Sequence, residues 1–228
     1  MADALFGTQG GEFNKRGGLY AEIRTQYLHD READRAAIFR AFGSMKANMA
    51  NDSLGQDLAV VLFSGHGAII GNRFYLLPYG VDARTPAELK ASAISAEDFH
   101  NEVAELAKHG RVLVLLDACH SGAITGDGLT LTSDGDRLRS EMSASNVTVL
   151  TSSTKNEFSR EDDKWNNGAF TKVLVEALGK DADENHDGLI SMSELTHYVW
   201  THVVSLTDGQ QHPGKEERFE GGLFIAGR

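Results

Sequence analysis

The sequence contains a single cysteine, Cys119, among its 228 residues. One thiol cannot form a disulfide within the chain, so covalent cross-links play no part in the fold. This thiol is therefore either an inert core group or a reactive one. The sequence also lacks any apolar run near the roughly 18 residues that a membrane helix needs, and it lacks a signal-peptide pattern at its start. These absences predict a soluble, cytoplasmic protein with no membrane partner.

Positive charge is also scarce in this chain. There are 22 Lys and Arg residues against 33 Asp and Glu residues, which gives a formal net charge of −11. Such a chain repels a phosphate backbone, and no cluster of cations offsets this, so we expect no nucleic-acid partner. A length of 228 residues is enough for one sizeable core. We therefore expect one α/β domain over residues 1–228.

Two short, unbroken apolar runs, at 58–63 and 112–116, predict strands that are buried on both faces of a parallel sheet. The glycines around His66 predict that the first strand stops there. A helix that starts at Ser95 and stops before Gly110 joins the two runs, as in a right-handed crossover. Other expected elements are a strand over 20–28, a helix capped by Asp30 that includes Ile38 to Met49, a hairpin strand over 74–77, a strand over 147–151, helices over 170–178 and 192–206, and a final strand over 223–226.

The stretch from Ala123 to Asn146 is rich in Gly, Ser, Thr and Asp. It is longer than the loops of compact domains usually are when they have no function. We therefore predict a flexible loop over 123–146 that is open to cleavage.

His66 and Cys119 each come at the end of one of the two apolar runs. Parallel sheets carry their chemistry just beyond the carboxyl ends of the strands, and neighbouring strands lie roughly 4.8 Å apart, so the two side chains can meet. An imidazole beside a thiol can remove its proton and produce a nucleophilic thiolate. The backbone amides of Gly67 and Cys119 supply two donors for an oxyanion. The pattern predicts acyl transfer, with Cys119 as nucleophile and His66 as base.

An inert interpretation of these residues stays open. A free cysteine is most often a small buried apolar group, and a lone histidine is most often a hydrogen-bonded core residue. Two matched positions, each beside glycine at the tip of an apolar run, favour catalysis over this alternative. His120 is a poorer base, because adjacent residues leaving a strand point in opposite directions. Ser121 is a poor nucleophile, because the G-x-S-x-G elbow requires glycine where Cys119 stands.

The sequence resembles the caspase-like cysteine peptidases (peptidase C14), and within them the metacaspase and bacterial orthocaspase branch. Ser64-Gly65-His66-Gly67 is similar to the family's histidine motif, and Asp117-Ala118-Cys119-His120-Ser121-Gly122 to its cysteine motif. His66 and Cys119 are 53 positions apart, close to the spacing of about 50 in caspases. Similarity continues through Gly168-Ala169-Phe170-Thr171. The resemblance implies a three-layer α/β/α sandwich around a mostly parallel sheet. It also implies an endopeptidase that works through a thioester acyl-enzyme and needs no cofactor for its chemistry.

The start of the chain departs from the family pattern. The family opens with an apolar strand, whereas the few residues before Tyr20 are rich in Gly and polar groups. We therefore expect that first strand to be missing from this sequence. Metacaspases also carry a second pocket aspartate in the helix after that strand. Asp3 is the nearest candidate for this residue.

Asp117 precedes Cys119 by two positions, and residues two apart in a strand face the same side. We therefore expect its carboxylate to line the pocket for the residue before the scissile bond and to favour Arg or Lys there. Caspases proper carry Gln-Ala-Cys-Arg-Gly and prefer aspartate, whereas this sequence lacks that positive charge. The alternative is that Asp117 only caps local backbone amides. Further pocket contacts are expected from Glu157, Ser159 and Glu161, unless these residues form a solvated acidic loop.

The expected partners are polypeptide substrates with Arg or Lys before the scissile bond. Arg137 and Arg139 meet this requirement within the loop over 123–146, so we predict self-cleavage after one of them. Two other classes of function stay open: a catalytically silent caspase-like module for signalling or assembly, and a calcium-binding module without chemistry. Both Cys119 and His66 are retained with their glycines, which favours the peptidase.

Residues 183–194 match the twelve-residue EF-hand loop, which binds Ca²⁺ through oxygen ligands. Gly188 stands at position 6, where this loop turns sharply. The candidate ligands are Asp183, Asn185, Asp187, Leu189 through its carbonyl, and Glu194. The alternative is an Asx-rich turn between two helices, in which Ser191 and Glu194 form a capping box.

Overall fold

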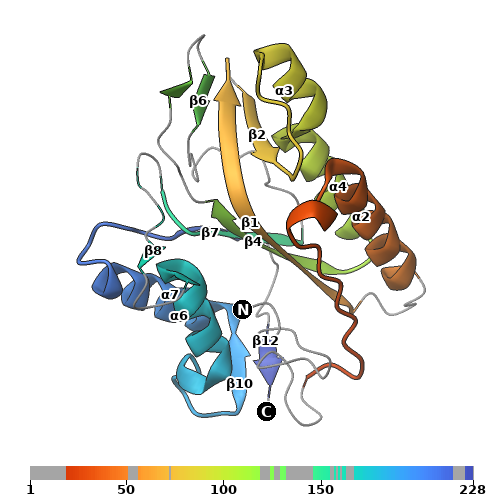
Figure 1. Ribbon diagram of the computed structural model, residues 1–228. Helices are drawn as coiled ribbons and strands as arrows, with labels where there is room; N and C mark the ends of the chain where they lie inside the picture. The colour runs from red at the N-terminus through yellow and green to blue at the C-terminus, as the bar shows by residue number, and fades with distance from the viewer. Residues whose placement is uncertain are drawn as a thin grey trace. The chain divides into compact units, whose positions relative to one another are not determined.

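A computed structural model of the chain describes residues 19–50, 56–71, 73–118, 124–125, 129–131, 146–154, 157, 159, 161–162, 167–217 and 224–227. The chain forms two compact units, which we describe one at a time (Figure 1). The sheet unit contains residues 28–159 and 214–219, and the helical unit contains residues 1–27, 160–213 and 220–228. The expectation of a single domain over 1–228 stays a prediction.

The sheet unit is built on a mixed sheet whose described strands follow the order β11-β7-β4-β1-β2-β3. The three central strands are parallel to one another, and their outer neighbours run antiparallel to them. A short hairpin of β5 and β6 joins the far part of β1 through β6. The strands are β1 (Leu58–Ile70), β2 (Arg73–Leu77), β3 (Ile94–Ser95), β4 (Arg111–Ala118), β5 (Ile124–Thr125), β6 (Leu129–Leu131), β7 (Val147–Thr151) and β11 (Gly214–Glu217).

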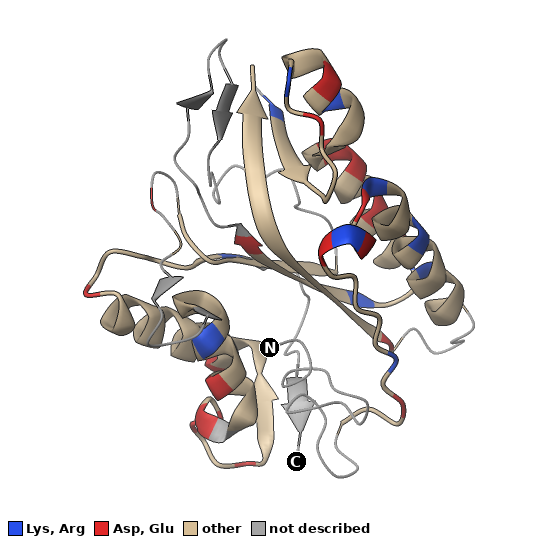
Figure 2. Cartoon of the chain, viewed as in Figure 1, with Lys and Arg blue, Asp and Glu red and all other residues tan. Residues whose placement is uncertain are grey.

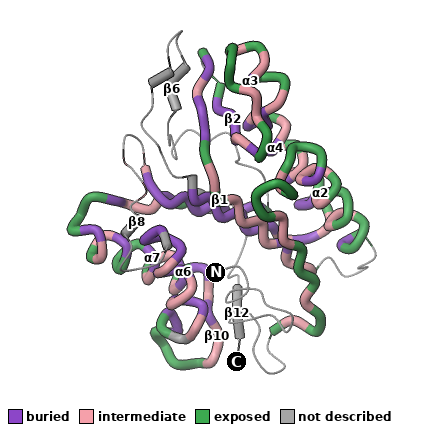
Figure 3. The backbone as a smooth tube through the Cα atoms, in the orientation of Figure 1, coloured by how far each residue is buried: buried purple, intermediate pink, exposed green. Residues whose placement is uncertain are grey.

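Strands β4 and β7 are the buried centre of this sheet. The residues from Val112 to Leu116 are at most 1% exposed, and every residue of β7 is buried (Figure 3). A strand that is covered on both faces needs an apolar or small residue at nearly every position, which explains why these runs do not alternate. Both strands confirm the sequence prediction, and the predicted hairpin strand over 74–77 is confirmed by β2.

Strand β1 is longer than the sequence predicts. The prediction ends it at the glycines around His66, but the strand continues through them to Ile70. It pairs with β4 as far as Gly65, and from His66 onward it pairs with β2 on its other edge. The predicted end is wrong because a glycine weakens a strand without ending it where a new pairing partner is available. Packing also requires Gly67, since a Cβ at this position would lie 2.3 Å from Cζ of the fully buried Phe74.

Two helices, α2 (Arg35–Met49) and α4 (Ala96–Leu106), cover one face of the sheet and pack against each other. The rings of Phe42 and Phe99 meet edge to face with their centroids 5.4 Å apart, and they share a core with alternate residues of β4 and β7. The outward surfaces of both helices carry charges of both signs (Figure 2), and Lys46 pairs with Glu102 across them at 2.7 Å. The predicted α/β class is confirmed.

The starts of the helices differ in how well the sequence predicted them. Ser95 caps α4 as predicted, by accepting a hydrogen bond from the amide of Asp98. Asp34 caps α2, so the prediction of Asp30 as its cap is wrong; Asp30 instead begins a 3-10 turn, η1 (Asp30–Glu32). Helix α3 (Pro86–Ser92) was not predicted, although the Thr85-Pro86-Ala87-Glu88 sequence carries both a cap and a first-turn proline.

The predicted strand over 20–28 is also wrong. These residues form no strand, and they are exposed or half-buried along their whole length. Although apolar and polar residues alternate here, the apolar ones are not buried. A strand needs a buried face or a pairing partner to be stable. Part of the predicted loop over 123–146 is strand, in β5 and β6, and the described remainder of that range is the residue before β7.

The helical unit contains α6 (Ala169–Glu176), which continues as a π-helical turn, η2 (Ala177–Asp181), and α7 (Met192–Leu206). Strand β10 (Leu189–Ser191) precedes α7 and pairs with β12 (Phe224–Gly227), while β8 (Glu161–Asp162) pairs with β9 (Asn167–Gly168). The bounds of α7 match the prediction, whereas Gly179 lies inside η2 and does not close the helix. In the described part of the chain, no helix has the length and apolarity to cross a bilayer.

Candidate active site

Polar residues form one row where the parallel pairing of β1, β4 and β7 ends. Ser64 of β1 is the Cα partner of Asp117 of β4, and the amide of Ser152, just after β7, donates to the carbonyl of Leu116 at 2.8 Å. Paired residues of parallel strands face the same side of a sheet. Ser64, Asp117 and Ser152 therefore stand side by side on one face, at the edge where parallel sheets carry their sites.

Asp117 is the acidic residue of this row, and only 2% of its surface is exposed. The Ser159 hydroxyl donates to Oδ1 of Asp117 at 3.2 Å, and the hydroxyls of Ser152 and Ser159 are in hydrogen-bond contact. A buried carboxylate is costly unless hydrogen bonds replace the water that it loses. The Ser159 hydroxyl provides part of this replacement, and Ser152 in turn contacts Ser159.

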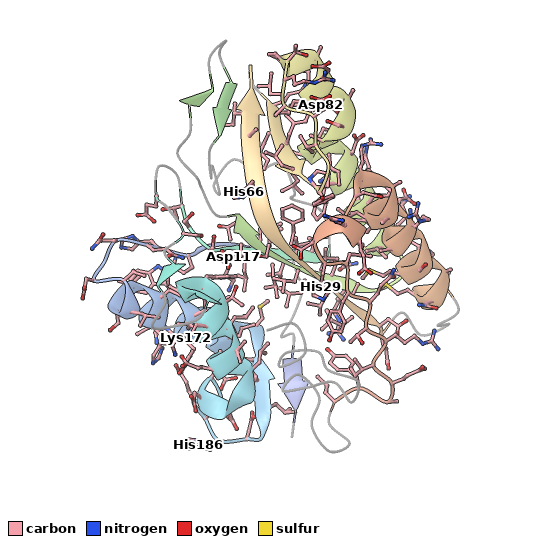
Figure 4. The ribbon with its side chains drawn as sticks, in the orientation of Figure 1. His29, His66, Asp82, Asp117, Lys172 and His186 are labelled. Atoms are coloured by element: carbon pink, nitrogen blue, oxygen red, sulfur yellow. The ribbon has the colours of Figure 1, made fainter. Side chains whose placement is uncertain are left out.

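His66 lies on β1, two residues beyond Ser64, and its side chain is exposed. The period of two along a strand places it on the face that carries Asp117. Figure 4 shows the two residues on neighbouring strands of the sheet. An exposed imidazole on the same face as a buried carboxylate is accessible to groups that arrive from solvent.

Cys119 lies outside the described residues, so its predicted place opposite His66 is not observed. The chain on either side of it is informative. Cys119 is bonded to Ala118, and Ala118 is the Cα partner of Gly65, which is bonded to His66. The parallel ladder between β1 and β4 thus ends one peptide bond before both predicted catalytic residues.

The other predicted site residues have different outcomes. Ser159 contacts Asp117, and Glu157 is half-buried with its amide donating to the carbonyl of Thr154 at 3.4 Å. Gly67 is a buried residue inside β1, and its role as an oxyanion donor stays a prediction. Glu161 lies on β8 of the helical unit. Three further predicted residues lie outside the described part of the chain: Asp3, Arg137 and Arg139.

Sequence reasoning missed two residues of this row, Ser64 and Ser152. Ser64 belongs to the histidine motif and stands two positions before His66, so the period of two could have placed it on the catalytic face. Ser152 carries no signal of its own, because its position depends on the pairing of β7 with β4, which a local pattern does not reveal.

The acidic loop of the helical unit is held by its own side chains. The buried Asp183 accepts hydrogen bonds from the amides of Asp187 and Gly188, both at 3.2 Å, and Gly188 has a φ of 84°. Asn185 Oδ1 accepts from the amide of Asp187 at 2.8 Å, and Asp187 Oδ1 accepts from that of Leu189 at 2.8 Å. These are the contacts of a tight Asx-rich loop between two helices.

Glu194 closes this loop at the start of α7. Its carboxylate accepts hydrogen bonds from the Ser191 amide at 2.9 Å and from the Ser191 hydroxyl at 2.7 Å, and the Asn185 amide donates to it at 3.4 Å. Burial raises the pKa of Glu194, but these hydrogen bonds outweigh it and bring the pKa below its usual value, while the charge of Asp187 acts in the opposite direction. The predicted capping box is confirmed. Within the described residues, no three His, Cys, Asp or Glu side chains lie close enough together to hold a metal ion.

Comparison with known proteins gives one family and a similar fold. The family model described as the caspase domain, Peptidase_C14, matches residues 20–220. Among solved structures, protein GSU0716 from Geobacter sulfurreducens aligns with a TM-score of 0.57 at 16% identity, over 89% of this chain and 80% of that one. Caspase-1 from Spodoptera frugiperda aligns with a TM-score of 0.42 at 15% identity, over 84% of this chain and 71% of that one. No curated protein matches the sequence.

Proposed function

The chain belongs to the caspase-domain family of peptidases, and on this premise we propose that it is a cysteine endopeptidase that cuts polypeptides after Arg or Lys. Cys119 is the nucleophile and His66 is the base. We assign the chain to the metacaspase and orthocaspase branch, and this assignment is supported by the Asp117 carboxylate, where caspases proper have glutamine. Its substrates are polypeptides with a basic residue before the scissile bond.

The observation that carries this proposal is the register of β1 against β4. The pair of Gly65 and Ala118 brings the two strands together immediately before His66 and Cys119. Consecutive Cα atoms are about 3.8 Å apart, and paired strands about 4.8 Å. This register supports the proposal that the thiol of the residue after Ala118 reaches the imidazole on the neighbouring strand.

The chemistry follows from these two groups. The imidazole of His66 takes the proton of the Cys119 thiol, and the thiolate attacks the carbonyl carbon of the scissile bond. The amides of Gly67 and Cys119 donate to the oxyanion that forms. The amine leaves with the proton that His66 returns, and the thioester that remains is hydrolysed when His66 removes a proton from water.

Specificity follows from Asp117. Its carboxylate is buried on the face that carries His66, so a basic side chain that reaches it loses water on both sides of the contact. A charge-assisted hydrogen bond gains strength in such surroundings. An acidic side chain would instead meet a like charge, which disfavours binding.

The experiment is a panel of matched peptides that end in Arg, Lys, Gln or Asp before the reporter group, incubated with the wild type, Cys119→Ala and His66→Ala. We expect turnover of Arg and Lys peptides by the wild type and a loss of at least about 10⁴-fold in both variants. His120→Ala is the matched control and should retain activity. Turnover of Asp peptides in preference, or equal activity of Cys119→Ala, contradicts the proposal. A folded wild type without turnover favours the silent module.

A second proposal concerns the acidic loop, which we infer binds Ca²⁺. The supporting observation is that the loop lies between two helices, turns at Gly188 with positive φ, and is followed by the short strand β10. Five of its oxygen-bearing residues stand at EF-hand positions: Asp183, Asn185, Asp187, Leu189 and Glu194. Glu194, the last of these proposed ligands, also accepts hydrogen bonds from the amide and hydroxyl of Ser191 at the start of α7.

A further inference from the structure

We propose that Ser152 and Ser159 form a hydroxyl relay that positions the Asp117 carboxylate, and that this relay sets the preference for a positively charged substrate side chain. Both serines are then positioning residues. Ser159, which the sequence predicted as a substrate contact, acts through Asp117 instead. The inference rests on the proposed peptidase function and refines its specificity.

The relay joins three separate segments of the chain. Asp117 is the last residue but one of β4, Ser152 follows β7, and Ser159 lies seven positions further along the chain. Ser159 Oγ is 3.2 Å from Asp117 Oδ1, and it is in contact with Ser152 Oγ. Ser152 itself is fixed by its amide, which donates to the Leu116 carbonyl at 2.8 Å.

The direction of the two hydrogen bonds follows from the number of hydroxyl protons. A hydroxyl has one proton to donate, and an ionised carboxylate can only accept. The proton of Ser159 therefore points to Asp117, and the proton of Ser152 points to Ser159. Hydrogen bonds in such a chain polarise one another, so that Ser152 strengthens the bond from Ser159 to the carboxylate.

This arrangement suits a carboxylate that has to remain charged. Asp117 and Ser152 are each 2% exposed, so water does little to stabilise the negative charge. Hydroxyl donors stabilise the ionised carboxylate over its protonated form, and they do so without cancelling its charge. The carboxylate thus keeps its attraction for a guanidinium or ammonium group.

The backbone around the relay holds Ser159 in place. The Thr151 hydroxyl donates to the carbonyl of Ser153 at 3.1 Å, which fixes the exit from β7. The amide of Glu157, two residues before Ser159, then donates to the carbonyl of Thr154 at 3.4 Å. These contacts order the described backbone between β7 and Ser159.

The test compares arginyl peptides with citrullyl peptides, which are neutral and have nearly the same shape. The measured quantity is the ratio of their kcat/KM values. We expect Ser159→Ala to lower this ratio about tenfold and Ser152→Ala about threefold, mainly through a higher KM for the arginyl peptide. Ser159→Thr keeps the hydroxyl and should restore most of the ratio. Ser153 follows Ser152 in the chain and is buried to a similar extent. Ser153→Ala is therefore the matched control and should leave the ratio unchanged.

The decisive comparison repeats Ser159→Ala in an Asp117→Ala background. If the serine acts through Asp117, it has no further effect on the ratio once the carboxylate is gone. Equal losses for arginyl and citrullyl peptides with Ser159→Ala, or an undiminished effect without Asp117, overturn the relay. If the wild type cleaves no arginyl peptide, the proposed function fails first and the relay with it. Thermal unfolding of each variant separates these outcomes from loss of the fold.

Discussion

Ser64 and Asp117 are Cα partners in the parallel ladder between β1 and β4. Because partners in parallel strands face the same side, this one pair fixes the face on which the site is built. His66 is two residues beyond Ser64, and Cys119 is two residues beyond Asp117. The geometry that we propose for catalysis therefore depends on the register of two strands and not on the course of a loop.

The thiol of Cys119 should react with iodoacetamide at mildly acidic pH. An unperturbed thiol with a pKa of about 8.5 is only about 0.3% ionised at pH 6, whereas an imidazole partner increases the thiolate fraction. We expect alkylation of the folded wild type at pH 6 to be at least about tenfold faster than that of His66→Ala. Rates followed by mass spectrometry check this, and both proteins should react equally in urea. Equal rates in the folded state would show that the thiol is inert.

Replacing Asp117 with Asn should remove the preference for basic residues. The substitution keeps the shape of the side chain and removes its charge, so a bound Arg loses a buried charge partner worth about 3 kcal/mol. We expect kcat/KM for arginyl peptides to fall by about a hundredfold. Glu157→Gln, on a half-buried turn, is the matched control and should cost much less. A larger effect of Glu157→Gln would show that Glu157, and not Asp117, is the residue that recognises the basic side chain.

The sequence was sufficient for the elements that carry their own pattern. The unbroken apolar runs predicted β4 and β7, and the caps and apolar spacing predicted α4 and α7. It failed where a partner distant in the chain decides the outcome. The glycines around His66 resemble a strand end, yet pairing with β2 continues β1 beyond them. Residues 20–28 alternate like a strand but do not form one. Ser152 was missed for the same reason, because its position next to Asp117 in the row depends on the pairing of β7 with β4.

Self-cleavage should occur after Arg137 or Arg139 and should need Cys119. Incubated wild type should give two fragments on a denaturing gel, and Cys119→Ala should give none. The cut separates β4 from β7, which are hydrogen-bonded partners, so the two fragments should stay together in size-exclusion chromatography. The double variant Arg137→Gln and Arg139→Gln should remain intact. Identical fragments from wild type and Cys119→Ala would assign the cleavage to a contaminant.

Calcium should bind to the acidic loop of residues 183–194. Calorimetry should show uptake of Ca²⁺ by the wild type and an affinity at least about tenfold lower for Asp187→Ala, because the loss of a charged ligand weakens such a loop. Glu184→Ala changes a loop residue that stands at a position without a ligand, and it is the matched control. No difference between Asp187→Ala and the wild type would leave the loop as a helix cap.

Two glycine substitutions should change stability in opposite directions. In Gly67→Ala the new Cβ would lie 2.3 Å from Phe74 Cζ, so we expect a loss of about 1–3 kcal/mol in the free energy of unfolding. In Gly43→Ala, on the exposed side of α2, nothing lies within 4 Å of the new Cβ, so we expect a gain of about 0.5–1 kcal/mol. Thermal or urea unfolding measures both. An unchanged free energy of unfolding in Gly67→Ala would show that the core does not require glycine at this position.

Strand β11 follows all the other strands of this sheet in the sequence, and it forms the edge of the sheet next to β7. Its sequence is Gly-Lys-Glu-Glu, in which three of the four residues carry charge. Charged outer strands hinder the addition of further strands from other molecules, whereas an uncovered valine-rich strand such as β7 invites it. A nascent or shortened polypeptide that ends before residue 214 would leave the backbone of β7 unprotected, and we expect such a product to form aggregates rather than a smaller stable protein.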